Sequence, residues 1–122
     1  MKHFAIPVLR IFNYDKAFDF YINWLEFNID WVREDAPSLP RYFQISSDSV
    51  KIHLTEHHGD CSPGAKVFIE FSFLKEFHKE LIDKNYLFYK PTIEHAPWNA
   101  LIMEVTDPFG NKLIFNESLN MR

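Results

Sequence analysis

The stretch Trp98–Phe115, WNALIMEVTDPFGNKLIF, predicts a strand, a tight turn and a second strand. Its centre, Asp107-Pro108-Phe109-Gly110-Asn111, has the chemistry of a turn. The proline presets φ at about −65°, the glycine allows a positive φ at no steric cost, and the asparagine tolerates the same region. Because apolar runs flank this turn on both sides, we expect it to join two antiparallel strands of one sheet.

The rest of the chain predicts the same order of elements twice, offset by about 60 residues. In the first half we expect a strand at Phe4–Ile11, an amphipathic helix at Tyr14–Leu25, and strands at Phe27–Asp35, Arg41–Ser46 and Ser49–Thr55. In the second half we expect a strand at Lys66–Phe73, a helix at Leu74–Ile82, a strand at Tyr86–Glu94, a turn at His95–Pro97 and the closing hairpin. The prediction is an α+β fold: one domain, residues 1–122, of two βαβββ modules, at about 1–58 and 65–118, forming a curved mixed sheet.

Composition and charge narrow the possible functions. Aromatic residues make up 17% of the chain, enough to line a binding site as well as fill a core. The formal net charge is −4, whereas a nucleic-acid-binding surface needs a basic stripe, so we expect no nucleic-acid partner. The one cysteine, Cys61, excludes an internal disulfide and favours a reducing, cytoplasmic setting. No signal-peptide pattern and no apolar run of about 20 residues is seen, so we expect no membrane partner.

Alternation along three predicted strands separates two kinds of face. One face is apolar and should pack against the helices; it carries Val50, Ile52 and Leu54, then Val67, Ile69, Phe71 and Phe73, then Leu113 and Phe115. The opposite face mixes polar and aromatic side chains; it carries Lys51, His53 and Thr55, then Lys66, Phe68, Glu70 and Ser72, then Lys112, Ile114 and Asn116. A curved sheet with such a concave face predicts a cleft for a small ligand.

Several segments together resemble the bleomycin resistance proteins of the glyoxalase/bleomycin resistance/extradiol dioxygenase, or vicinal oxygen chelate, superfamily. The segments that carry the resemblance are Ala5–Leu9, Ala17–Tyr21, Leu25–Phe27, Asp30–Asp35, Pro97–Trp98 and Asp107–Asn111. They cover nearly the whole chain in order. Glu26 departs from the family, which usually has glycine after the first helix. Because a left-handed cap would cost a non-glycine residue about 1 kcal/mol, we expect this helix to end differently.

The resemblance implies a homodimer with two equivalent drug clefts at the subunit interface. It implies resistance by sequestration, in which bleomycin-type glycopeptides are bound stoichiometrically and left chemically unchanged. In such relatives a pair of aromatic side chains sandwiches the planar bithiazole tail of the drug, and acidic groups receive its cationic end.

The candidate ligand-binding residues are Asp30, Trp31, His53, Phe68, Glu70, Trp98 and Glu104. Trp98, Trp31 and Phe68 are the candidate aromatic walls, and the three carboxylates are candidate partners for a cation. Each has an ordinary alternative. Trp98 could be a core or interface aromatic, and the carboxylates could form ion pairs with Lys51, Arg10 or Lys112. Trp24 lies on the apolar stripe of the first helix and is predicted to be core.

Metalloenzymes of the superfamily place ligands at four positions that match Ile6, His53, Phe68 and Ile114 here. Only one of these side chains can bind a metal, whereas a typical site needs three or more protein ligands. We therefore expect no metal, no cofactor and no catalysis. The alternatives are a metal-dependent lyase, dioxygenase or thiol transferase of the superfamily, or a binding module for another small aromatic metabolite.

The segment Glu56–Gly64 contains His57, His58, Asp60 and Cys61. Its spacing matches no metal motif, so we interpret it as a polar loop, with contact to a ligand at the cleft mouth as a milder functional possibility. Cys61 has neighbouring histidines but neither a third group nor an oxyanion motif, so we do not expect a nucleophile.

Overall fold

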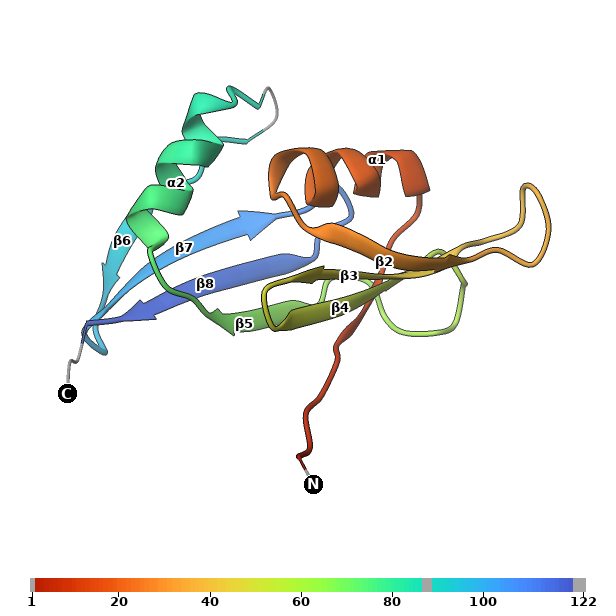
Figure 1. Ribbon diagram of the computed structural model, residues 1–122, viewed down its shortest axis with the longest axis horizontal. Coiled ribbons are helices and arrows are strands. Elements are labelled where there is room, and N and C mark those ends of the chain that lie inside the picture. Colours follow the sequence, from red (N-terminus) through yellow and green to blue (C-terminus); the bar gives the residue numbers. More distant parts are fainter. Residues whose placement is uncertain (1, 87–88, 120–122) are drawn as a thin grey trace. The chain divides into compact units, whose positions relative to one another are not determined.

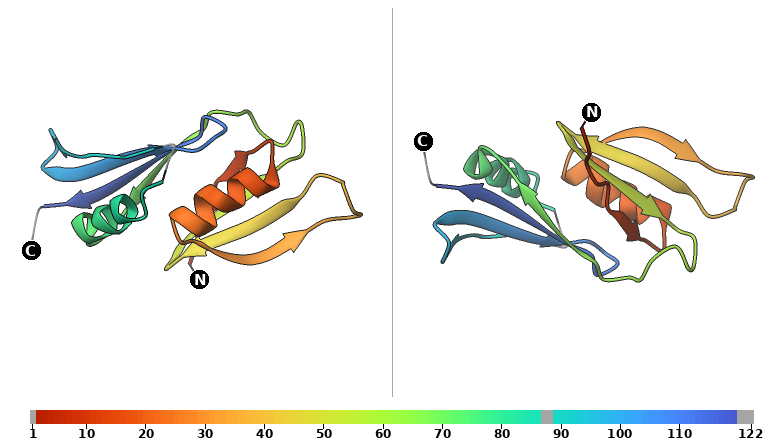
Figure 2. Two further views of the ribbon diagram at one scale, coloured as in Figure 1. Left: turned by 90° about the horizontal axis from the view of Figure 1, so that it is seen from above. Right: turned by 90° about the horizontal axis from the view of Figure 1, so that it is seen from below.

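The computed structural model describes residues 2–86 and 89–119 of the chain. It divides into two compact units, unit 1 (Met1–Ala65 and Asp107–Asn111) and unit 2 (Lys66–Thr106 and Lys112–Arg122). Within the described residues each unit carries one helical region and one four-stranded mixed sheet (Figures 1 and 2). The α+β class and the two βαβββ modules are therefore confirmed, with a separate sheet in each module.

Unit 1 has the sheet order β1-β4-β3-β2, in which β1 is parallel to β4 and the other pairs are antiparallel. Its elements are β1 (Val8–Arg10), α1 (Tyr14–Phe18), the π-helical segment η1 (Asp19–Trp24), β2 (Asn28–Arg33), β3 (Tyr42–Ser47) and β4 (Val50–Thr55). Asn13 caps α1, because its Oδ1 accepts the Lys16 amide at 2.9 Å. Trp24 is buried, as predicted.

The first helix ends on a left-handed residue, and the expectation that it would end differently is wrong. Glu26 has φ +64°, and the next amide, of Phe27, reaches back to the Tyr21 carbonyl at 2.9 Å. This resembles the Schellman arrangement but spans one residue more, because the helix ends in the π-helical segment η1. The Phe27 ring is buried and contacts the Tyr21 ring edge-on, with centroids 6.4 Å apart. Apolar packing of the residue after the cap thus fixes the left-handed conformation without a glycine.

Unit 2 has the sheet order β5-β8-β7-β6, in which β5 is parallel to β8. Its elements are β5 (Lys66–Glu70), α2 (Leu74–Asp83), β6 (Ile93–Ala96), β7 (Ala100–Thr106) and β8 (Lys112–Ser118). The predicted closing hairpin is confirmed, since β7 and β8 pair antiparallel from Ala100↔Ser118 to Thr106↔Lys112.

The strand and turn before this hairpin differ from the prediction. β6 begins only at Ile93, after Pro91, which has no amide to donate to a ladder. It then runs through the predicted turn to Ala96, which pairs with Ala100, and the turn falls at 97–99. Asn99 supplies the positive φ, +59°, that this turn requires. Residues 87–88 of the predicted strand lie outside the described residues.

The predicted division into faces holds on β5 and on β4 as far as Leu54, but Thr55 on the opposite face of β4 is also buried, and the division does not hold on β8. Ile52, Leu54 and Ile69 are buried, while Phe68 on the opposite face is 53% exposed. Along the central strand β8, Leu113 to Asn116 are all buried, so both of its faces are covered. Alternation alone cannot distinguish a strand covered on both faces from one that has a solvated side.

Phe73 is not on the apolar face, which corrects the prediction. β5 ends at Glu70, and Phe73 lies at the N-terminal end of α2 with φ +61° and its side chain 71% exposed. Its amide and that of Leu74 donate to the Glu117 carboxylate, at 3.1 and 3.0 Å. Glu117 therefore caps the helix in place of the Phe73 side chain.

Replacing Phe73 by asparagine is expected to raise the free energy of unfolding by about 1 kcal/mol. The exposed ring contributes little burial, whereas asparagine adopts the left-handed region more readily than phenylalanine does. Urea unfolding followed by circular dichroism measures the change. Phe4→Asn, at an exposed phenylalanine without positive φ, is the control. A loss of stability in Phe73→Asn would contradict the expectation.

The turn Asp107–Asn111 belongs to unit 1, although it connects two strands of unit 2. The buried Asp107 carboxylate accepts the Tyr21 hydroxyl at 2.7 Å and the amides of Phe109 and Asn111 at 2.8 Å each. The Asn111 side-chain amide donates to Asp107 Oδ2 and to the Arg10 carbonyl. The turn residues therefore bind both the first helix and β1.

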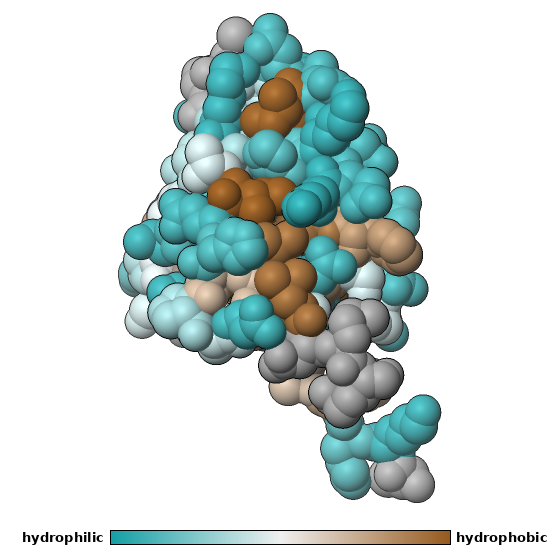
Figure 3. Space-filling view, turned by 90° about the vertical axis from the view of Figure 1, so that its left-hand side faces the viewer, coloured by the Kyte–Doolittle hydropathy of each residue, from teal (hydrophilic) through white to brown (hydrophobic). Residues whose placement is uncertain are grey.

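The face drawn in Figure 3 carries its hydrophobic surface as patches surrounded by hydrophilic residues. In the described part of the chain, no helix has the length and apolar character needed to cross a membrane.

Candidate functional site

Three ring side chains gather on neighbouring strands of unit 1; we call Trp31, Tyr42 and His53 the aromatic cluster. The Trp31 and Tyr42 rings are nearly parallel, with centroids 6.1 Å apart and 8° between their planes. His53 meets both rings edge-on, at 5.2 Å from each. Trp31 is 42% exposed, so one aromatic surface of the cluster remains open to a ligand.

A chain of hydrogen bonds fixes this cluster. The Tyr42 hydroxyl lies 2.7 Å from His53 Nδ1, and His53 Nε2 lies 2.9 Å from Gln44 Oε1. Gln44 Nε2 donates to Asp30 Oδ2 at 2.8 Å, and Ser46 donates to Asp30 Oδ1 at 2.9 Å. Because Gln44 Oε1 can only accept, His53 carries its proton on Nε2 and accepts from Tyr42 at Nδ1. The predicted residues Asp30, Trp31 and His53 are thus brought together.

A register shift in β2 places Asp30 and Trp31. Ile29 pairs with Ile45 and Trp31 pairs with Gln44, so Asp30 is an extra residue between the two pairs. A bulge of this kind redirects side chains. Here the Asp30 carboxylate reaches the amide of Gln44 while the Trp31 ring lies over Tyr42.

We expect the fluorescence of the aromatic cluster to depend on pH. Burial lowers the pKa of His53 below its usual 6.5. The unfolded chain then binds the proton more readily, so stability falls as pH decreases from 6.5 through the folded pKa. A protonated imidazole beside an indole also quenches its fluorescence. Tryptophan fluorescence should therefore fall with a midpoint below pH 6.5, and the step should be missing from His53→Gln. A step that persists in this variant would contradict the assignment.

In unit 2, the strand register places the other candidates on one face of the sheet. Phe68 pairs with Ile114, which pairs with Glu104, and Glu70 pairs with Asn116, which pairs with Ile102. These positions therefore lie on the same side of β5, β8 and β7. Phe68 and Glu70 lie on this face as predicted, and Glu104, for which no face was predicted, shares it.

Trp98 is held over the same face by hydrogen bonds. Its indole N–H donates to Asn116 Oδ1 at 2.8 Å, and Asn116 Nδ2 donates to Glu70 Oε1 at 3.2 Å. The Trp98 side chain is 53% exposed, so it is not a core aromatic of the chain. The bonds fix the position of the ring and leave its surface accessible.

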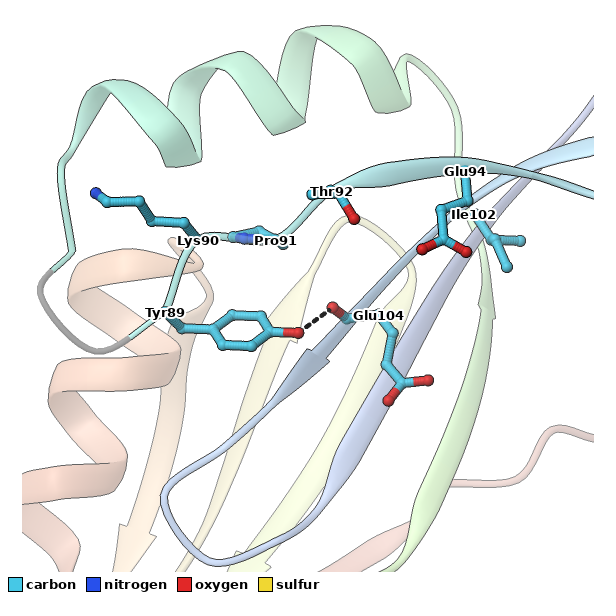
Figure 4. Close-up of a pocket in the computed structure, with 7 residues that line it drawn as sticks. All are labelled: Tyr89, Lys90, Pro91, Thr92, Glu94, Ile102 and Glu104. Atoms are coloured by element: carbon cyan, nitrogen blue, oxygen red, sulfur yellow. Dashed lines mark hydrogen bonds between the residues drawn. The ribbon is translucent and has the colours of Figure 1, made fainter.

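A cavity of about 290 Å³ opens beside this face, lined by Tyr89, Lys90, Pro91, Thr92, Glu94, Ile102 and Glu104. The Tyr89 hydroxyl donates to the Glu104 carbonyl at 2.9 Å, and the Lys90 ammonium points away from the carboxylates of Glu94 and Glu104 (Figure 4). Lys112 is 3.9 Å from Glu104, a long and exposed ion pair of little energetic weight. Glu104 thus forms the ion pair with Lys112 that was the alternative to ligand binding, and it also lines the cavity.

Within residues 2–86 and 89–119, no metal-binding cluster forms at the four positions that match metal ligands in superfamily enzymes. None forms in the loop Glu56–Gly64 either. In these residue ranges, no three histidine, cysteine, aspartate or glutamate side chains are placed to hold one metal ion. His57 binds locally instead, with Nδ1 3.1 Å from the Thr55 hydroxyl and 4.0 Å from Asp60. The absence of a catalytic metal stays a prediction.

The family model described as "Glyoxalase superfamily protein" matches residues 2–122. The chain belongs to the glyoxalase superfamily. No curated protein sequence matches this glyoxalase superfamily chain.

Solved structures similar to this glyoxalase superfamily chain agree on the fold. A glyoxalase family protein from Bacillus anthracis is 17% identical with TM-score 0.74, covering 97% of this chain and 96% of that one. The bleomycin resistance determinant encoded on transposon Tn5 is 15% identical with TM-score 0.74, covering 98% and 100%. A bleomycin-binding protein complexed with bleomycin is 18% identical with TM-score 0.70, covering 96% and 99%. At these identities the likeness establishes the fold alone.

Four residues of these sites were not predicted from the sequence: Tyr42, Gln44, Tyr89 and Glu94. A signal for the first two was present, because Tyr42, Gln44 and Ser46 alternate with the buried Phe43 and Ile45 along β3. Tyr89 and Glu94 had no comparable signal, since their place follows from the late start of β6.

Proposed function

We propose that this chain binds a bulky, aromatic, cationic small molecule of the bleomycin type and sequesters it without chemical change, as a cytoplasmic homodimer. The observation that carries the proposal is the pairing of exposed indole rings with fixed polar partners. The Trp31 ring is nearly parallel to that of Tyr42, in the cluster whose hydrogen-bond chain ends at the Asp30 carboxylate. The Trp98 indole is hydrogen-bonded to Asn116, which in turn donates to Glu70. Fixed aromatic surfaces with nearby carboxylates suit a planar, positively charged ligand, because little ordering is needed on binding.

The hydrogen bonding of His53 supports binding rather than metal catalysis. Among the four positions that match metal ligands in superfamily enzymes, His53 has the only coordinating side chain. Both of its ring nitrogens are used, by Tyr42 and by Gln44. Coordinating a metal would require breaking one of these hydrogen bonds, which themselves fix the aromatic cluster.

Titration with bleomycin under tryptophan fluorescence tests the proposal. We expect quenching that saturates at one drug molecule per chain, and recovered drug of unchanged mass. Trp31→Ala and Trp98→Ala should each raise the Kd about 3- to 10-fold, since stacking adds about 0.5–1.5 kcal/mol beyond burial. Phe4→Ala, at an exposed aromatic outside these faces, should leave the Kd unchanged.

No quenching at about 100 μM drug, a concentration far above the Kd of a useful sequestering protein, would refute bleomycin as the ligand. Drug recovered with an altered mass would refute sequestration and indicate catalysis. Sedimentation equilibrium checks the homodimer, and a monomer at micromolar concentration would contradict it.

A further inference from the structure

Arg10, the last residue of β1, is a buried cation that pairs with no carboxylate of residues 2–86 and 89–119. Its side chain is 8% exposed, and within the described residues no ion pair involves it. This corrects the alternative that Arg10 balances a candidate carboxylate. The guanidinium donates one hydrogen bond, from Nη1 to the Ile11 carbonyl, and lies 4.6 Å from the centroid of the Phe12 ring. A guanidinium has five N–H donors, so most of its capacity remains for another acceptor.

Arg10 lines a cavity of about 450 Å³ in unit 1, together with Phe12, His58, Gly59, Cys61, Ser62 and Pro63. The Phe12 ring is 56% exposed and is supported edge-on by Phe109, with centroids 5.9 Å apart. Burial, and then the charge of Asp60, raise the pKa of the Cys61 thiol, and the charge of Arg10 lowers it in part. The cavity thus combines one buried positive charge, an apolar wall and small polar groups.

We propose that this cavity binds a small aromatic carboxylate, with the carboxylate on Arg10 and the ring against Phe12. A guanidinium matches the two oxygens of a carboxylate with two parallel N–H donors. Among the described residues no buried side-chain nitrogen lacks a hydrogen-bond partner, so the Arg10 nitrogens that donate to no protein acceptor are open to solvent and accessible to an anionic ligand. The volume is in the range of small-molecule sites. None of the lining residues belongs to the aromatic cluster or to the face around Trp98, so the proposal is independent of drug binding.

Alkylation of Cys61 reports on occupancy, because it is the only cysteine of the chain. The full-length protein is treated with iodoacetamide, an uncharged reagent, with and without 2-naphthoate, and modification is followed by mass spectrometry. We expect 2-naphthoate to slow alkylation several-fold and saturably. The neutral analogue 2-naphthylmethanol should protect about 10- to 100-fold less effectively, as the loss of a charge-assisted pair predicts.

Variants then test the role of the guanidinium. Arg10→Met keeps the aliphatic stem and should raise the half-protecting concentration of 2-naphthoate about 10- to 100-fold. Arg41→Met removes an arginine that does not line the cavity and should leave protection unchanged. Equal protection by naphthoate and naphthylmethanol in the wild-type protein, or no protection by either, would overturn the proposal without any variant. Bleomycin binding is measured separately, so its failure would leave this result intact.

Discussion

Replacing Asp107 by alanine is expected to lower the free energy of unfolding by about 3 kcal/mol. The carboxylate is buried and accepts from the Tyr21 hydroxyl, two turn amides and the Asn111 side chain. Alanine leaves three buried donors, from Tyr21 and Asn111, and the part-buried Phe109 amide without their acceptor. Each buried donor left without an acceptor costs about 1–3 kcal/mol of stability, and relaxation of the turn reduces the total loss. Urea unfolding followed by circular dichroism measures the loss.

Tyr21→Phe is the matched variant, because it removes one of the four donors and keeps the ring. It should lower stability by about 1 kcal/mol. If Asp107→Ala lowers the free energy of unfolding by no more than Tyr21→Phe does, the carboxylate does not organise the turn.

Tyr21 is also expected to make the free energy of unfolding depend on pH in the alkaline range. Burial first, and then the Asp107 charge and hydrogen bond, raise the pKa of Tyr21 well above its usual 10.0. The folded chain therefore keeps a proton that the unfolded chain releases. Stability from this difference is complete below pH 10 and is lost as pH rises toward the folded pKa. Tyr21→Phe should remove this part of the alkaline sensitivity.

Replacing Glu56 by alanine is expected to lower the free energy of unfolding by about 2 kcal/mol. Its Oε2 accepts the Tyr14 amide at the first turn of α1, at 2.9 Å, and its Oε1 accepts the Arg41 amide at 2.8 Å. One carboxylate thus fixes the start of the helix and the chain entering β3. Its negative charge also favours the N-terminal end of the helix.

Glu117 is the counterpart of Glu56 in unit 2, because it comes from the last strand and caps α2 through two amides. Glu117→Ala should cost about 1 kcal/mol, less than Glu56→Ala, because the exposed Phe73 amide can be hydrated. Glu56→Gln keeps an acceptor and should lose less than Glu56→Ala. Thermal unfolding of the three variants gives the ranking, and a Glu56→Ala variant as stable as the wild type would contradict it.

The sequence by itself determined the elements whose signals are local. Turn residues 107–111 between two apolar runs predicted the closing hairpin, and apolar spacing predicted both helices. Alternation predicted which side of β4 and β5 is buried. These features depend on backbone preferences and side-chain periods within a few residues, so neighbouring positions in the chain are sufficient to predict them.

Only the tertiary structure decided the contacts that carry the candidate sites. Glu56 reaches the Tyr14 amide across 42 residues, and the Tyr42, His53 and Asp30 chain depends on a bulge that no local signal marks. Arg10 looked like half of an ion pair and is instead a buried cation facing a cavity. The physical reason is that strand register and packing determine which residue a polar group contacts, because they bring distant residues together. Neither can be predicted from a short stretch of sequence.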